Sequence, residues 1–126
     1  MFSLGANSLE RLSHVHPDLQ KVVKRAIQIT PIDFRVGEGI RTIERQRQLV
    51  AAGASKTMNS RHLDGHAVDL LALVDGEVRW DWPLYHKIAA AMKAAAVELN
   101  IPLEWGGDWL KFKDGPHFQL PWKQYP

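Results

Sequence analysis

The stretch AVDLLALVDGEVRW (residues 67–80) decides the fold, because it has the pattern of a β-hairpin. Its first part, Ala67–Val74, is largely apolar. Asp75-Gly76 is a strong two-residue turn signal, and a shorter segment, Glu77–Trp80, follows it. A hairpin of this kind predicts that the chain contains an antiparallel sheet.

Helical patterns dominate before the hairpin, and short strands follow it. We expect helices with Asn7 as N-cap and Glu10 closing a capping box, from Pro17 to before Pro31, from about Thr42 to Ala52, and from Pro83 to Asn100. Strands are predicted at Asp33–Val36, Leu103–Trp105 and His117–Leu120, with a turn bracketed by Gly37 and Gly39. This order predicts an α+β fold, in which one compact domain over residues 1–126 packs its helices on a small antiparallel sheet.

Composition limits the classes of function. The 126 residues include no cysteine, which excludes disulfides, thiolate metal ligands and thiol catalysis. The net charge is only +2, without the basic patch and interleaved aromatics of a nucleic-acid-binding protein. No apolar run approaches the roughly 18 residues of a membrane span, and the first residues lack the pattern of a signal peptide. We therefore expect a chain made in the cytoplasm, without membrane insertion and without a nucleic-acid partner.

The six histidines fall into two groups. His14, His16 and His86 lie in or beside predicted helices, and we interpret them as surface or capping residues. His62 and His66 form an H-x-x-x-H pair that invites comparison with the helical zinc motif H-E-x-x-H. That motif needs a Glu after the first His and a continuous helix. Leu63 occupies the first place and Gly65 disfavours the second, so this interpretation fails.

A second pairing joins His62 to Asp69. Asp69 interrupts an apolar strand, where an ionised carboxylate is costly unless a cation or hydrogen bonds compensate it. The spacing fits a metal site. It equally fits an Asp on the solvent side of the strand, because side chains alternate between the two faces.

The segment Asp114-Gly115-Pro116-His117 predicts a tight turn that lets Asp114 and His117 converge on one point. Such a layout suits a metal ligand beside a base that acts on water. Two His and one carboxylate leave a fourth position open on zinc, as in catalytic sites. An ordinary β-turn with an incidental His gives the same pattern.

The segment SRHLDGHAVD (residues 60–69) fits the pattern S-x-H-x-x-G-x-A-x-D at all five fixed positions. Together with the late D-x-P-H segment, it resembles the zinc D-alanyl-D-alanine carboxypeptidases and, more closely, the phage L-alanyl-D-glutamate peptidases. LQKV (19–22), EGIRT (38–42) and WGGDW (105–109) are also similar to those endolysins. The resemblance covers nearly the whole chain.

The resemblance implies a zinc metallopeptidase in which His62, Asp69 and His117 bind Zn²⁺. It implies that Asp114 is the catalytic acid/base and that Arg41 stabilises charge on the attacked carbonyl. Ser60 is expected to make a supporting hydrogen bond. His66 falls at a variable place of the motif and is left out of the metal shell. Trp105, Trp109 and the glycines between them are expected in a cleft wall or in the core.

The implied function is a phage endolysin that hydrolyses the L-alanyl-D-glutamate amide of the peptidoglycan stem peptide and lyses the host. The expected enzyme is a monomer without a separate wall-binding domain, held in the host cytoplasm until a holin-type pore gives access to the wall. Two alternatives stay open: a D-alanyl-D-alanine carboxypeptidase or dipeptidase, and a non-catalytic wall-binding module.

Overall fold

An antiparallel sheet organises the computed structural model, which describes residues 1–53 and 60–126. Four strands run in the order β1-β2-β5-β4, and β3 also pairs with β2. Their bounds are Asp33–Glu38 for β1, Ala67–Val74 for β2, Glu77–Arg79 for β3, Glu104–Trp105 for β4 and His117–Gln119 for β5. All pairings are antiparallel. The predicted α+β class and the predicted hairpin are therefore confirmed.

The central strand β2 has one face in the core and the other towards a pocket. Val68, Leu70 and Ala72 are fully buried, whereas Asp69 and Leu71, between them, are only partly buried. This is the alternation of a strand whose two faces meet different surroundings. β1 pairs along one edge of β2, and β3 and β5 share the other edge.

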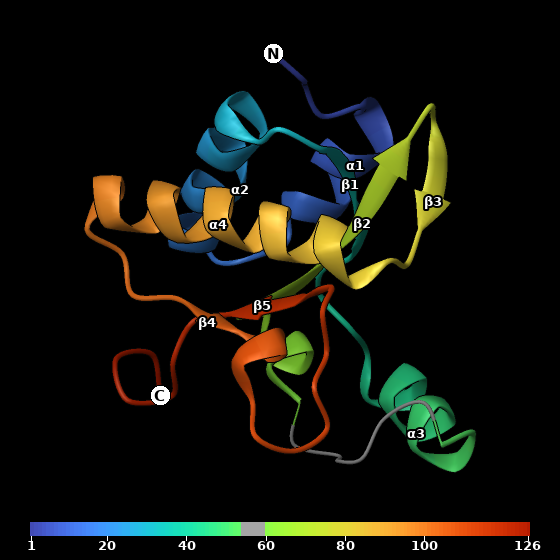
Figure 1. Cartoon of the computed structure of the whole chain (residues 1–126). Helices are drawn as coiled ribbons and strands as arrows, with labels where there is room; N and C mark the ends of the chain where they lie inside the picture. Colours follow the sequence, from blue (N-terminus) through green and yellow to red (C-terminus); the bar gives the residue numbers. More distant parts are fainter. Residues whose placement is uncertain (54–59) are drawn as a thin grey trace.

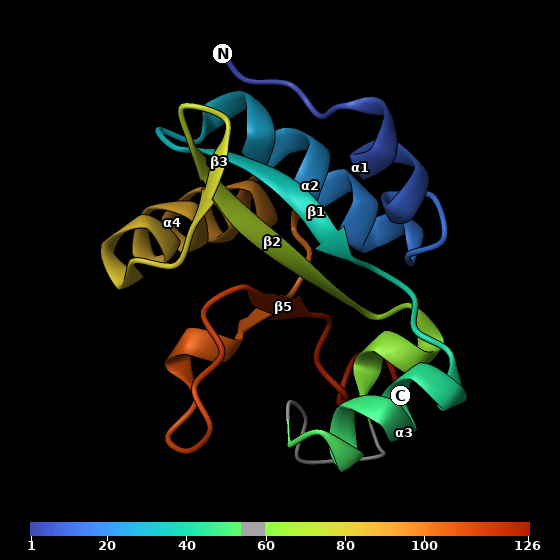
Figure 2. The same ribbon diagram turned by 90° about the vertical axis from the view of Figure 1, so that its right-hand side faces the viewer.

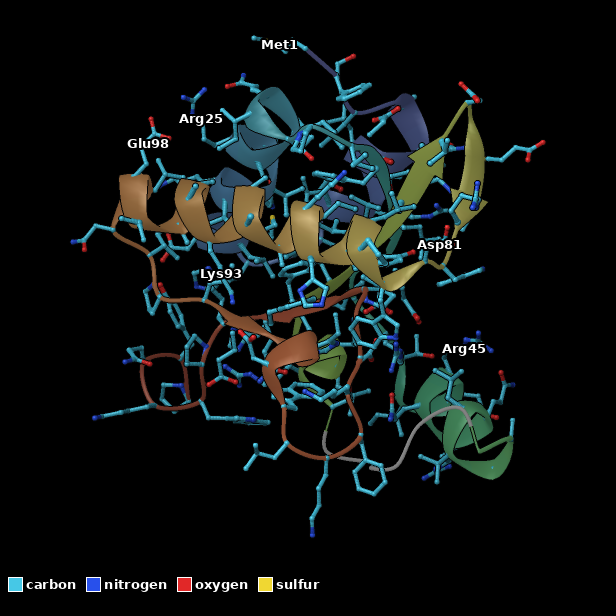
Figure 3. All side chains as sticks on the ribbon, viewed as in Figure 1. Met1, Arg25, Arg45, Asp81, Lys93 and Glu98 are labelled. Carbon is cyan, nitrogen blue, oxygen red and sulfur yellow. The ribbon has the colours of Figure 1, made fainter. Side chains whose placement is uncertain are left out.

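The helices are α1 (Ala6–Leu12), α2 (Pro17–Ile29), α3 (Ile43–Ala51) and α4 (Trp82–Leu99). α2 and α4 pack against each other, and Figure 1 shows both beside the upper part of the sheet while α3 lies apart from them. At one end of this pair Arg25 of α2 donates to Glu98 of α4 over 2.7 Å, and Figure 3 shows the two side chains next to each other. One hydrophobic core fills the space between these helices and the sheet.

The turn between β2 and β3 has the backbone that its sequence predicts. Asp75 and Gly76 have φ of 52° and 79°, the left-handed pair of a tight hairpin turn. α4 fixes this hairpin through the buried Tyr85. Its hydroxyl donates to the carbonyl of Arg79 over 2.7 Å and accepts from the N–H of Ala72 over 3.2 Å.

Two local predictions are wrong. The N-cap of α1 is Gly5 rather than Asn7, and no side chain caps this helix. Gly37 lies inside β1 rather than at the edge of a turn, because pairing with β2 continues to Glu38 after an irregularity in register. The other helix and strand predictions agree with the structure to within a few residues.

Two segments lie in the part of the molecule that is away from the packed helices α2 and α4. One is the stretch between β4 and β5, which contains the short 3₁₀ helix η2 (Gly106–Asp108). The other is α3. In Figure 2 they lie on opposite sides of the lower half of the molecule. No helix among the described residues is long and apolar enough to cross a membrane.

Candidate metal centre and its pocket

A pocket of about 920 Å³ opens on the face of the sheet that carries Asp69 and Leu71. This volume lies in the range of sites that hold small ligands or peptide segments. The structure brings the five site residues expected from the sequence into the wall of this pocket: Arg41, His62, Asp69, Asp114 and His117.

The sheet places three of the pocket's charged or polar side chains in one row. Asp69 of β2 pairs with Glu38 of β1 on one side and with His117 of β5 on the other. Residues directly opposite each other in paired strands have side chains on the same face. The carboxylate of Asp69 is therefore held between its two neighbours by backbone hydrogen bonding alone.

His62 reaches the same point from a short 3₁₀ helix, η1 (Arg61–Asp64). Ser60 caps this helix, and its hydroxyl accepts from the N–H of His62 over 3.2 Å, which is the supporting hydrogen bond expected from the sequence. Gly65 ends the helix with φ of 75°, a conformation that favours glycine. The fixed Ser and Gly of the motif thus orient the His between them.

Potential ligand atoms of His62, Asp69 and His117 all lie within 4.8 Å of one another. Oδ1 of Asp69 is 3.3 Å from Nε2 of His62 and 3.5 Å from Nδ1 of His117. The two imidazole rings meet edge to face. Both histidines are buried, and all three residues line the pocket.

The outer nitrogen of each imidazole has a fixed acceptor. Nδ1 of His62 donates to the carbonyl of Gly39 over 2.8 Å. Nε2 of His117 is 2.7 Å from Oε1 of Gln119. The amide nitrogen of Gln119 donates to Glu104 over 3.1 Å, so its oxygen faces the histidine. Hydrogen bonds of this kind fix the tautomer and the orientation of histidine ligands to metals.

With the outer nitrogens protonated, the inner nitrogens of the neutral rings carry lone pairs that point at a carboxylate oxygen. Oδ1 of Asp69 is buried and has no hydrogen-bond partner among the described residues. Three acceptors that converge on one point without a donor need a cation between them. Two His and one carboxylate are a ligand set that suits zinc with an open position. The residues therefore fit a catalytic metal.

A proton is the alternative occupant of the cluster. Burial alone would raise the pKa of Asp69, but close approach of His117 and His62 holds it well below its usual range. Burial alone would lower the pKa of His117, but the contact with Asp69 raises it. Because protons and metal compete for the same atoms, metal binding must weaken as the pH falls.

Asp114 stands at the mouth of the pocket, on the turn that leads into β5. Its N–H donates to the carbonyl of Gly106 over 3.0 Å. A Cβ atom at Gly106 would lie 2.4 Å from the Asp114 carbonyl oxygen, so only glycine permits this approach. Nε1 of Trp105 also donates to the carbonyl of Gly115 over 2.7 Å. The segment after β4 therefore holds the Asp114 turn in place.

Partial burial raises the pKa of the Asp114 carboxyl, and the negative charge of Asp69 adds to this. Electrostatic interactions with His117, His62 and Arg41 lower this pKa and act in the opposite direction. A carboxyl group with a raised pKa is suited to take up and return a proton near neutral pH.

Arg41 is tied to the centre through both its backbone and its side chain. Its N–H donates to the carbonyl of His62 over 2.7 Å. Its guanidinium makes two hydrogen bonds to Glu38, at 2.8 and 2.7 Å, and a third to Gln46 at 2.7 Å. One of its nitrogens lies 3.9 Å from Oδ2 of Asp69. The side chain is largely buried and oriented beside the centre before any substrate binds.

His66 lies outside this group. Its ring faces His16 and Tyr125, with ring centroids 5.4 and 6.2 Å away. His16 is a capping residue as expected, because Nδ1 accepts from the N–H of Asp18 at the start of α2. The two tryptophans divide between the expected positions: Trp105 belongs to the core, and Trp109 lines the pocket beside His117.

The sequence reasoning missed the residues that support the ligands. Glu38, Glu104 and Gln119 all line the pocket, and each contacts a member of the centre or its direct partner. One signal was available: Gln119 follows His117 by two residues in a predicted strand, which places both on one face.

Comparisons with known proteins agree with this geometry. The family model of phage L-alanyl-D-glutamate peptidases matches residues 1–120. This chain belongs to that family. The L-alanyl-D-glutamate peptidase of Escherichia phage T5 is 37% identical over 112 residues, which cover 86% of this chain and 82% of the relative.

Two bacterial proteins extend the likeness. The peptidoglycan L-alanyl-D-glutamate endopeptidase CwlK of Bacillus subtilis (strain 168) is 29% identical over 124 residues, covering 86% of this chain and 74% of the relative. The crystal structure of the Serratia marcescens L-Ala D-Glu endopeptidase ChiX superposes with a TM-score of 0.92 at 50% identity. That superposition covers 96% of this chain and 91% of ChiX. The fold is therefore shared with this member over nearly its full length.

Proposed function

We propose that this chain is a zinc-dependent endopeptidase that hydrolyses the amide between L-Ala and D-Glu in the stem peptide of bacterial peptidoglycan. The observation that carries the proposal is the cluster of His62, Asp69 and His117, whose inner atoms converge without a donor in a peptide-sized pocket. Membership of the L-alanyl-D-glutamate peptidase family supports the choice of bond. Residues 1–126 act as one catalytic domain.

Each residue of the centre has a separate role. His62, Asp69 and His117 hold the metal. A zinc ion there supplies a Lewis acid for the scissile carbonyl and lowers the pKa of a bound water from about 15.7 to about 7. Asp114 takes the proton from the attacking water and returns it to the amine of D-Glu as the amide bond breaks.

Arg41 stabilises the negative charge that develops on the attacked carbonyl oxygen. Glu38 and Gln46 hold its guanidinium in place, so it needs no rearrangement during the reaction. Loss of one such donor costs about 100- to 1000-fold in rate. An Arg41→Met variant that retained its zinc and the wild-type rate would remove this role.

The proposal extends to the biological setting of the enzyme. The substrate partner is the stem peptide of peptidoglycan, and the enzyme works as a monomer. As a phage endolysin it remains in the host cytoplasm until a holin-type pore lets it reach the wall, where cleavage lyses the cell.

Mass spectrometry of digested, purified peptidoglycan tests the proposal. The zinc-loaded chain should release fragments with a new D-Glu amino terminus, and a chelator should abolish the release until zinc is restored. Loss of only a terminal D-Ala would identify a D-alanyl-D-alanine carboxypeptidase instead. Binding of peptidoglycan without any new amino terminus would identify a non-catalytic module.

A further inference from the structure

The charged side chains that line the pocket differ in how far the protein itself already satisfies them. Among the described residues it has four carboxylates and four permanent cations: Glu38, Asp69, Glu104 and Asp114, and Arg41, Arg61, Lys111 and Lys113. An anionic ligand that enters the pocket needs a cation whose donors are still free. The four cations differ in this respect.

Both arginines are already engaged by the protein. Arg41 makes its hydrogen bonds to Glu38 and Gln46. The buried Arg61 donates to the carbonyl oxygens of Leu120 and Tyr125, and its guanidinium lies 3.9 Å from the centre of the Trp122 ring. Arg61 therefore ties the C-terminal segment to the helix η1 and has little left for a ligand.

The two lysines lie on the loop that carries the base, and both are exposed. Lys113 directly precedes Asp114. Within the described part of the chain, its ammonium group makes one long hydrogen bond, 3.3 Å to the carbonyl of Gly107. That contact ties the side chain to the segment after β4, and Lys113 itself lines the pocket. An ammonium group has three donors, so at least two of them remain for a ligand.

The substrate of the proposed function supplies an anion at the matching position. In a stem peptide, D-Glu is acylated on its nitrogen and continues through one of its two carboxyl groups, so the other stays ionised. The amine that Asp114 protonates belongs to this same residue. The free carboxylate is therefore only a few bonds from the atom that Asp114 reaches.

We propose that Lys113 binds the free carboxylate of D-Glu and so selects an acidic residue on the leaving-group side of the scissile amide. This inference rests on the proposed function and adds the residue that reads the substrate. A charge-assisted hydrogen bond of this kind corresponds to about a 10- to 100-fold preference for the acid over its amide.

Two synthetic stem peptides that differ only in that group, a free carboxylate or a carboxamide on D-Glu, provide the test. Wild-type zinc enzyme should cleave the acid with kcat/KM about 10- to 100-fold higher than the amide. Lys113→Gln should lower kcat/KM for the acid by that factor and leave the amide unchanged, so that the preference disappears. Lys123→Gln, an exposed lysine outside the pocket, serves as the matched control and should keep the preference.

The outcomes separate this inference from the function on which it rests. Equal cleavage of both peptides by the wild type, or an unchanged preference in Lys113→Gln, overturns carboxylate recognition by Lys113. If Lys111→Gln loses the preference and Lys113→Gln keeps it, Lys111 is the residue that recognises the carboxylate. That outcome also overturns the proposal for Lys113. A wild type that cleaves neither peptide overturns the proposed function itself, and this inference with it. Zinc content and thermal unfolding of each variant show whether it is folded.

Discussion

Two pairs of histidines include a member in or just after the helix η1, His62 with His117 and His66 with His16, and the pairs differ in how their polar atoms are satisfied. In the group of His62 and His117, the inner nitrogens point at Asp69, and none of the described residues places a donor between them. In the group of His16 and His66, the rings meet Tyr125 edge to face. His16 accepts a backbone N–H, and the Tyr125 hydroxyl donates to Asp18 over 2.7 Å.

The difference teaches that the number of histidines does not identify a metal site. Both groups are rich in imidazole and each has a carboxylate nearby. In the second group the chain supplies donors for His16 and for the nearby Asp64, and the described residues leave one buried nitrogen, Nδ1 of His66, without a hydrogen-bond partner. In the first group the chain supplies acceptors for the outer nitrogens of the two histidines. The atoms that face one another at the centre are then all acceptors. The direction of the lone pairs separates a packing cluster from a metal centre.

Removal of a metal ligand should have the largest effect and should separate the two groups most clearly. His62→Ala and His117→Ala should lose bound zinc and with it essentially all lytic activity, because two ligands do not replace three. His66→Ala, the matched change in the other group, should keep both. Metal analysis after gel filtration, together with turbidity loss of permeabilised bacteria, measures the effect. Full zinc occupancy in His62→Ala would remove His62 from the ligand set.

The base should be separable from the metal. Asp114→Asn should retain zinc and fold but lose about 100- to 10,000-fold in kcat, the usual contribution of a general base. Asp108→Asn, on the same segment but paired with Lys93 at the surface, is the control and should stay near the wild-type rate. An Asp114→Asn enzyme of normal activity would exclude Asp114 as the proton acceptor.

The support behind His117 should have a smaller effect. Gln119→Leu leaves the Nε2–H of His117 without its acceptor and frees the ring to rotate. We expect about a 10- to 100-fold loss of zinc affinity or activity, as is typical when such a partner is removed. Competition with a chelator measures the affinity. Unchanged affinity would mean that strand pairing alone orients this histidine.

The smallest expected effect is on the pH dependence of stability, and it involves His66 of the second group. Burial lowers the pKa of His66, against the opposing effect of Asp64. The folded chain therefore binds this proton less strongly than the unfolded chain, whose pKa is near 6.5. This contribution to stability is complete above that value and is lost as the pH falls through the lower folded pKa.

His66→Asn should accordingly reduce the fall in Tm between neutral and mildly acidic pH, measured on metal-free protein. His14→Asn, the same change at an exposed histidine two residues after α1, is the matched control. A slope unchanged by His66→Asn would show that other groups carry the acid sensitivity.

Much of the fold was predictable because its signals are local. Asp75-Gly76 requires a left-handed pair and so a hairpin, and Pro17 and Thr42 lie where two helices begin. The start of α1 was not predictable from its own residues. The hydroxyl of Ser8 accepts a hydrogen bond from the N–H of Val36 on β1 over 3.0 Å, a contact between residues far apart in the sequence. The helix that contains Ser8 starts before the predicted capping box.

The candidate site divides in the same way. The S-x-H-x-x-G-x-A-x-D pattern pointed to His62 and Asp69 because it contains both the residue and the local turn that orients it. Strand pairing places Glu38 and Glu104 beside the centre, as neighbours of Asp69 and Gln119. That register depends on bringing together segments that are far apart in the sequence. No pattern within either segment indicates it.

The three residues of the centre come from η1, β2 and β5, and β5 is the last strand in the sequence. A growing chain cannot complete the site until residue 117 has been made and paired with Asp69. The unfolded chain has no such site, so zinc binds almost only to the folded form. Zinc at 100 times its Kd would add about 2.7 kcal/mol to the free energy of unfolding. For the zinc enzyme proposed above, the supply of zinc at the time of synthesis would therefore influence how much folded protein accumulates, as well as how fast the enzyme works.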